Sequence, residues 1–96
     1  MTEVTYRNDD YEYSLEIKNH HEDKLACAGI SAIAWALAGA ISNRCEPDAI
    51  IFEDGYVNIR VEGSKRTDEA IRSFFFMAYI GLRQIELEYP GTITFS

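Results

Sequence analysis

Alternating apolar and polar residues near the start of the chain predict a β-hairpin. The apolar positions are Tyr11, Tyr13, Leu15 and Ile17, and the polar positions between them are Glu12, Ser14 and Glu16. This period of two is typical of a half-buried strand. Val4 and Tyr6 begin an earlier strand, and the turn-forming residues 8 to 10 separate the two.

Residues 25 to 41 are apolar in almost every position and predict a long helix. Alanine and glycine fill much of this segment, and Ser31 interrupts it. This composition favours a buried helix over a membrane span. A helix that is apolar nearly all round packs against the sheet on one face and needs a second apolar partner, such as another subunit, on the other. Ser42, Asn43 and Pro47 end the helix.

The second half of the chain repeats the order of strands followed by a helix. Residues 50 to 52 and 57 to 61 are strand-like and flank a turn at Glu53-Asp54-Gly55. Thr67 resembles a helix N-cap with the acids Asp68 and Glu69 in the first turn, and the periodic run of residues 71 to 89 follows until Pro90 ends it. Residues 91 to 95 alternate as a last strand. The predicted order is ββαββαβ, an α+β fold with a mostly antiparallel sheet and two packed helices.

Length and charge limit the classes of function. A chain of 96 residues suits one domain, residues 1–96, with a single core. The net charge of −7 comes from 9 Lys and Arg against 16 Asp and Glu. The longest basic run is the pair Lys65-Arg66, so direct binding of nucleic acid is not expected. An acidic surface favours a basic protein partner, and it is also typical of any soluble protein.

The cysteines and the start of the chain indicate the compartment. Cys27 and Cys45 are too few for a disulfide framework. Residues 1 to 4 lack the basic and apolar regions of a signal peptide. We therefore expect a cytoplasmic protein with reduced thiols and no membrane association. Cys45 stands in a polar loop, where we expect it to be exposed.

Cys27 is the strongest candidate for chemistry, because the chain's two histidines, His20 and His21, shortly precede it. Asp23 is a plausible N-cap, which places Cys27 near the first turn of the long helix. A thiol attacks as the thiolate, so it benefits from a nearby base and from the positive end of a helix. The spacing permits a Cys-His pair.

Two other interpretations of these residues remain open. Free cysteine is among the most buried residue types, so Cys27 alone would more often be a small core residue. A metal site would use His20, His21, Asp23 and Cys27, but their spacing matches no standard ligand pattern. The aromatic run at residues 74 to 76 is divided between the core and a surface for a dimer partner or a peptide.

The string from His20 to Ser31, HHEDKLACAGIS, resembles the signature of the ribosomal-processing cysteine protease family, Prp, also called YsxB-like. In that family a strand ends in Gly-His-Ala, a loop follows, and a helix opens with Cys-Ala, a small residue, Val or Ile, and then Ser. The resemblance extends to the opening hairpin, to the turn at Asp54-Gly55-Tyr56 and to the end of the late helix near Pro90.

The resemblance assigns a role to each matching residue. The nucleophile falls on Cys27, the general base on His20 and the family's serine on Ser31. His21 takes the place of the family's alanine. Backbone N–H groups near Cys27 and Ala28 would stabilise the oxyanion.

Two positions depart from the family pattern. Asn19 stands where the family has glycine before the histidine, and asparagine tolerates the left-handed backbone that glycine would supply. Lys24 stands where an aspartate is often found, while Asp23 lies one position away.

The resemblance implies a cytoplasmic, homodimeric cysteine endopeptidase without metal or organic cofactor. Relatives in the family remove a short N-terminal extension from the large-subunit ribosomal protein L twenty-seven, cutting beyond a pair of aromatic residues. The expected substrate is therefore a basic ribosomal protein precursor. The alternatives are a non-catalytic dimeric or ribosome-associated binding protein that retains the fold, and a small metal-binding domain.

Overall fold

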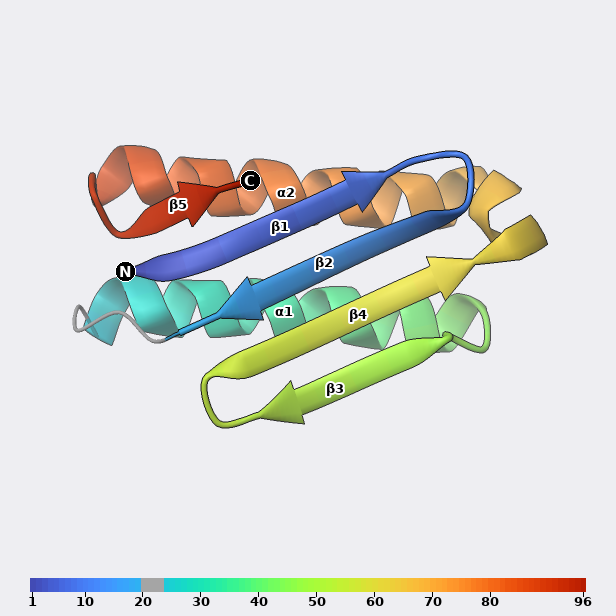
Figure 1. The fold of residues 1–96 in the computed structure, drawn as a ribbon, viewed down its shortest axis with the longest axis horizontal. Coiled ribbons are helices and arrows are strands. Elements are labelled where there is room, and N and C mark those ends of the chain that lie inside the picture. Colours follow the sequence, from blue (N-terminus) through green and yellow to red (C-terminus); the bar gives the residue numbers. More distant parts are fainter. Residues whose placement is uncertain (20–23) are drawn as a thin grey trace.

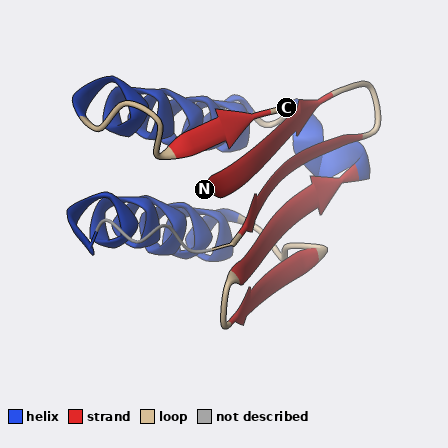
Figure 2. Cartoon of the chain, turned by 60° about the vertical axis from the view of Figure 1, so that its left-hand side comes forward, coloured by secondary structure: helices blue, strands red, loops and turns tan. Residues whose placement is uncertain are grey.

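The computed structural model describes residues 1–19 and 24–96, and this part of the chain forms two layers. A five-stranded sheet makes one layer, and two long helices cover one of its faces (Figures 1 and 2). The elements in chain order are β1 (Thr2–Asn8), β2 (Glu12–Lys18), α1 (Lys24–Arg44), β3 (Ala49–Glu53), β4 (Tyr56–Glu62), the 3-10 helix η1 (Gly63–Thr67), α2 (Glu69–Glu88) and β5 (Ile93–Phe95). The predicted α+β class and the predicted order of strands and helices along the chain, ββαββαβ, are confirmed.

The sheet is antiparallel except at one edge. Its strand order is β3-β4-β2-β1-β5, and β5 pairs with β1 in parallel. Both predicted hairpins are present, β1 with β2 and β3 with β4. Gly55 closes the second hairpin with a φ of 75°, a left-handed conformation that suits glycine. Central β2 bonds β1 on one side and β4 on the other.

The core lies between the sheet and the helices, because alternate residues of each strand point to the helical side. Leu15 of β2 is opposite Ile59 of β4, and both side chains are fully buried. From α2, Phe75 is also fully buried and stacks on Tyr13 with ring centroids 5.7 Å apart. The aromatic run of residues 74 to 76 is divided between core and surface as predicted, since Phe75 is buried and the adjacent Phe76 is 56% exposed.

The two helices run antiparallel and approach each other closely through glycine (Figure 1). A Cβ atom on Gly29 of α1 would meet Ile85 of α2 at 3.0 Å, and one on Gly81 of α2 would meet Ile33 of α1 at 2.9 Å. Each helix therefore places an isoleucine over the other's glycine. Glycine therefore lets α1 lie close to α2.

The prediction that α1 is a buried helix is only partly right. Its buried residues are Ala26, Ile30, Ala34, Leu37, Ala38 and Ile41. Part of its apolar surface lies open, since Leu25 is 68% exposed and Trp35 is 62% exposed although its ring stacks on Phe52 of β3. By length and composition alone α1 would also suit a membrane span, a test that core helices of soluble proteins also pass.

Two local predictions were wrong. Asp68, not Thr67, caps α2, because its carboxylate accepts the N–H of Ala70 at 2.9 Å. Thr67 instead ends η1, a 3-10 turn that the sequence did not reveal, with its hydroxyl bonded to Ser64. Cys45 is half-buried rather than exposed, since it continues from the end of α1 and packs against the core.

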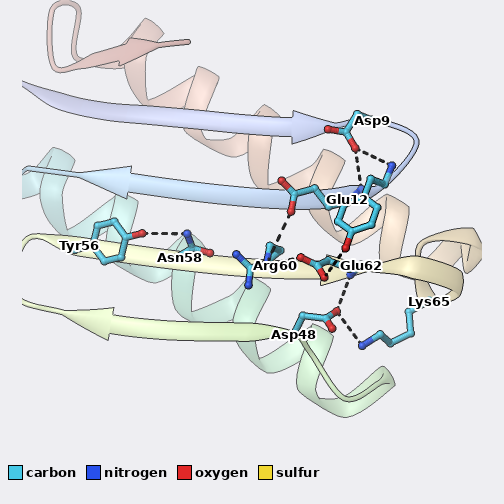
Figure 3. A network of polar contacts seen from close by, with 9 residues as sticks. Asp9, Glu12, Asp48, Tyr56, Asn58, Arg60, Glu62 and Lys65 are labelled. Carbon is cyan, nitrogen blue, oxygen red and sulfur yellow. Dashed lines mark hydrogen bonds and ion pairs between the residues drawn. The ribbon is translucent and has the colours of Figure 1, made fainter.

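The other face of the sheet is polar and uncovered. Figure 3 shows a chain of contacts across it, in which the Arg60 guanidinium lies 3.0 Å from the Glu62 carboxylate. At the end of β4, the Asp48 carboxylate accepts the N–H of Glu62 at 2.6 Å and pairs with the Lys65 ammonium at 2.9 Å. These contacts join β3, β4 and η1 at the end of the sheet opposite the β3–β4 turn.

Substituting one of two adjacent phenylalanines tests the core. Phe75→Ala removes a fully buried ring, and we expect the free energy of unfolding to fall by about 3–5 kcal/mol. Phe76→Ala, the matched control, removes a mostly exposed ring and should cost less than about 1 kcal/mol. Urea denaturation measures both. Equal losses would contradict the assignment of Phe75 to the core.

The Asp48 contacts predict a pH dependence of stability. The Lys65 ammonium, and then the N–H of Glu62, lower the pKa of the Asp48 carboxyl below its ordinary value. A lowered pKa stabilises the folded state above the unfolded pKa and loses that effect as the pH falls through the folded one. Asp48→Asn should therefore cost about 1 kcal/mol at pH 7 and progressively less below about pH 4.

The control for this experiment is Asp10→Asn, which changes an exposed carboxyl in the β1–β2 turn. Thermal unfolding at a series of pH values measures both variants. A loss of stability in Asp48→Asn that is the same at pH 7 and at pH 3 would rule out the ionised carboxylate as the cause.

Candidate active site

Cys27 lies in the first turn of α1, which begins at Lys24. Residues four apart on a helix share a face, so Cys27, Ser31 and Trp35 form one stripe along α1. All three line a pocket of about 120 Å³. A helix start is also where unpaired backbone N–H groups and the helix dipole favour negative charge.

The pocket lies between the first half of α1 and one end of the sheet. There β2 and β3 end, while β1 and β4 begin (Figure 1). Its other lining residues are Thr2, Ile17, Asn19, Ile30, Ala34, Phe52, Glu53, Gly55, Tyr56 and Val57. Most of these side chains are apolar, so the thiol faces a wall suited to apolar groups of a ligand.

A stacked aromatic pair forms one side of the pocket. The rings of Trp35 and Phe52 have centroids 4.0 Å apart and planes only 10° apart. Trp35 comes from α1 and Phe52 from the edge strand β3, so the pair ties the helix to the sheet edge. Sequence reasoning missed both, although the four-residue spacing from Cys27 through Ser31 to Trp35 was a usable signal.

Asn19 lines the pocket at the end of β2. Its φ is 67°, the left-handed backbone expected at this position. Its N–H donates to the carbonyl of Gly55 at 2.9 Å, which holds the end of β2 against the β3–β4 turn. Its side-chain amide donates to the Glu3 carboxylate on β1 at 2.5 Å.

The two cysteines differ in their surroundings. Cys27 is half-buried and does not belong to the core cluster, so the interpretation as a core cysteine is wrong. Cys45 lies beyond the opposite end of α1, and burial raises the pKa of its thiol. Only Cys27 of the pair lines a pocket with other polar groups among the described residues.

Of the other described candidates from the sequence, Ser31 lines this pocket and Ala28 is not among its lining residues. Ser31 is exposed on the pocket side of α1, one turn after Cys27. Ala28 is exposed and is the fifth residue of the helix, beyond the first four N–H groups that lack a helical acceptor. Thr2, which sequence reasoning did not select, is almost fully buried and lines the pocket.

His20, His21 and Asp23 lie outside the described residues, so their predicted roles as base, neighbour and N-cap stay predictions. Within residues 1–19 and 24–96, no three His, Cys, Asp or Glu side chains form a group that could hold a metal ion. The polar groups that line the described pocket are the Cys27 thiol, the Asn19 amide, the Glu53 carboxylate and the hydroxyls of Thr2, Ser31 and Tyr56.

Comparison with known proteins gives matches among solved structures. No protein-family model and no curated protein matches the chain. The structure of the ribosomal processing protease Prp from Staphylococcus aureus with a covalently linked product peptide matches with a TM-score of 0.83 at 22% identity. That match covers 100% of this chain and 98% of the other.

Two further structures agree with this match. Prp from S. aureus in complex with a substrate peptide has a TM-score of 0.82, 22% identity and the same coverage. A protein from Streptococcus mutans has a TM-score of 0.82 and 20% identity, and covers 100% of this chain and 92% of its own. The chain is therefore similar over its whole length to the ribosomal-processing protease Prp, and the predicted resemblance is confirmed at the level of the fold.

Proposed function

We propose that this protein is a cytoplasmic cysteine endopeptidase that removes an N-terminal extension from a basic ribosomal protein, L twenty-seven. The observation that carries the proposal is the position of Cys27, at the start of α1 and facing an apolar pocket. It is supported by the similarity of the whole chain to Prp structures that hold peptides.

The proposed reaction uses two side chains. His20 accepts the proton of the Cys27 thiol, and the sulfur attacks the carbonyl carbon of the scissile bond. Backbone N–H groups at the helix start stabilise the negative oxygen that forms. The C–N bond then breaks, His20 returns the proton to the leaving amine, and water hydrolyses the thioester to free Cys27.

The pocket supports an extended peptide with apolar side chains as the substrate. The stacked rings of Trp35, about two helical turns after Cys27, and of Phe52 on β3 offer a flat apolar surface. The net charge of −7 favours the approach of a basic precursor over long distances. Specific contacts in the pocket then select the segment to be cut.

Substitutions of the two proposed catalytic residues, each with a control at the chain's other residue of the same type, test the mechanism. Cys27→Ala should lower the cleavage rate at least about 10³-fold, and His20→Ala about 10²–10⁴-fold. Cys45→Ser and His21→Ala are the matched controls, and both should cleave at nearly the native rate. The assay follows a peptide spanning the end of the L twenty-seven extension by mass spectrometry.

Alkylation by iodoacetamide gives an independent measurement without a substrate. Cys45 serves as the internal reference, because burial raises the pKa of its thiol and slows its reaction at neutral pH. We expect Cys27 to react faster than Cys45 and to slow in His20→Ala. An inert Cys27, together with peptide binding but no cleavage, would favour the non-catalytic binding protein instead.

We also propose that two copies of the chain associate through the outer face of the helices. A groove of about 440 Å³ lies between α1 and α2. Its lining residues are Ile33, Ala36, Leu37, Ala40, Phe74, Met77, Ala78 and Gly81, none of them polar or charged. Residues 25–43 carry no charged side chain. A second copy that presents the same face would cover this surface in a self-complementary way.

Light scattering during size-exclusion chromatography tests the dimer. The native protein should elute with about twice the chain mass of 10.9 kDa. Met77→Glu places a charge at the groove and should give monomers, because an unpaired charge is costly in an apolar interface. Leu87→Glu, on an equally exposed part of α2 outside the groove, is the control. A native monomer would contradict the proposal.

A further inference from the structure

Asn19 is held on both sides by neighbours of β2. Its backbone N–H donates to Gly55, in the turn between β3 and β4, and its side-chain amide donates to Glu3 of β1. The strand order places β4 on one side of β2 and β1 on the other. Asn19, the first residue after β2, is therefore held by both neighbouring strands at the point where it lines the Cys27 pocket.

This double attachment has a conformational reason. A φ of 67° is unusual for a residue with a side chain, and Asn19 is the one described non-glycine residue with a positive φ. Left-handed backbone costs such residues free energy, although asparagine is the most tolerant of them. The side-chain bond to Glu3 is available only while Asn19 keeps its present position, so it offsets that cost.

We propose that Glu3 is a positioning residue of the active site. By holding the Asn19 amide, the Glu3 carboxylate keeps Asn19 in the left-handed conformation in which it lines the pocket. The residue that follows Asn19 in the sequence is His20, the proposed base. The inference thus rests on the proposed function and adds to it a residue on a strand that carries none of the reacting groups.

The location of Glu3 separates this role from direct catalysis. Glu3 of β1 lies opposite Lys18 of β2 in the strand register, and Glu3 is exposed. Alternate residues of β1 point to opposite faces, and Thr2 rather than Glu3 lines the pocket. Glu3 therefore acts on the pocket through Asn19 and does not face the thiol itself.

A double-mutant cycle tests the proposal. Glu3→Ala should lower kcat for the junction peptide about fivefold, the factor that one ordinary hydrogen bond represents, with a smaller change in KM. Glu3→Gln keeps an acceptor oxygen and should restore most of the rate. When Asn19→Gly is the starting protein, adding Glu3→Ala should change kcat no further, because glycine needs no anchor in this conformation.

Glu12→Ala is the control, since it removes a carboxylate near the far end of β2 and should leave kcat unchanged. A Glu3→Ala effect of equal size in both backgrounds would overturn the proposal, as would an unchanged kcat. So would a fall in kcat in Glu3→Ala that only follows a loss of thermal stability, because a purely structural role predicts that pattern.

NMR gives a readout that does not depend on cleavage. A positive φ brings the amide and α protons of one residue close together, so Asn19 should show a strong cross-peak between them. This cross-peak should weaken in Glu3→Ala and persist in Glu3→Gln and Glu12→Ala. If the native protein cleaves no peptide, the proposed protease function fails, and the cross-peak still decides the anchor: an unchanged peak in Glu3→Ala overturns it.

Discussion

The close packing of α1 against α2 is the constraint on which the rest of the molecule depends. Two antiparallel helices have to share one face of a narrow sheet, and they fit because each places an isoleucine over the other's glycine. This contact fixes where α1 lies across the strands. It therefore fixes the start of α1, and with it Cys27, beside the end of the sheet. A Cβ atom at Gly29 or Gly81 would force the end of the facing isoleucine side chain to shift.

The same packing explains the composition of α1. One face of the helix needs small residues to lie near the sheet, and another needs them near α2, so little of its surface is left for polar side chains. The third face is apolar although no described element covers it. A sequence pattern reports only that a helix is apolar all round. It cannot tell which face meets the sheet, which meets a helix and which awaits a partner.

Much of the fold was predictable because the strands alternate cleanly and the turns carry typical residues, as at Gly55. The errors have local or tertiary causes. Asp68 replaces Thr67 as the cap because Thr67 is the last residue of η1, a turn that the sequence did not reveal. Cys45 is half-buried because it packs against the core between α1 and β3, a contact that no local sequence signal reveals. The pairing of β5 with β1 likewise depends on contacts between the two ends of the chain.

The candidate site shows the same division between local and tertiary information. The position of Cys27 at a helix start follows from local sequence, whereas the left-handed backbone of Asn19 was suggested only by the glycine that the Prp family has at this position. The pocket wall was not, because Trp35 meets Phe52 only after α1 has packed against the sheet edge. A site assembled from the ends of four strands and one helix forms only when the sheet has formed and α1 has packed against it. The pocket beside Cys27 is thus a property of the complete fold, and no isolated segment of the chain should reproduce it.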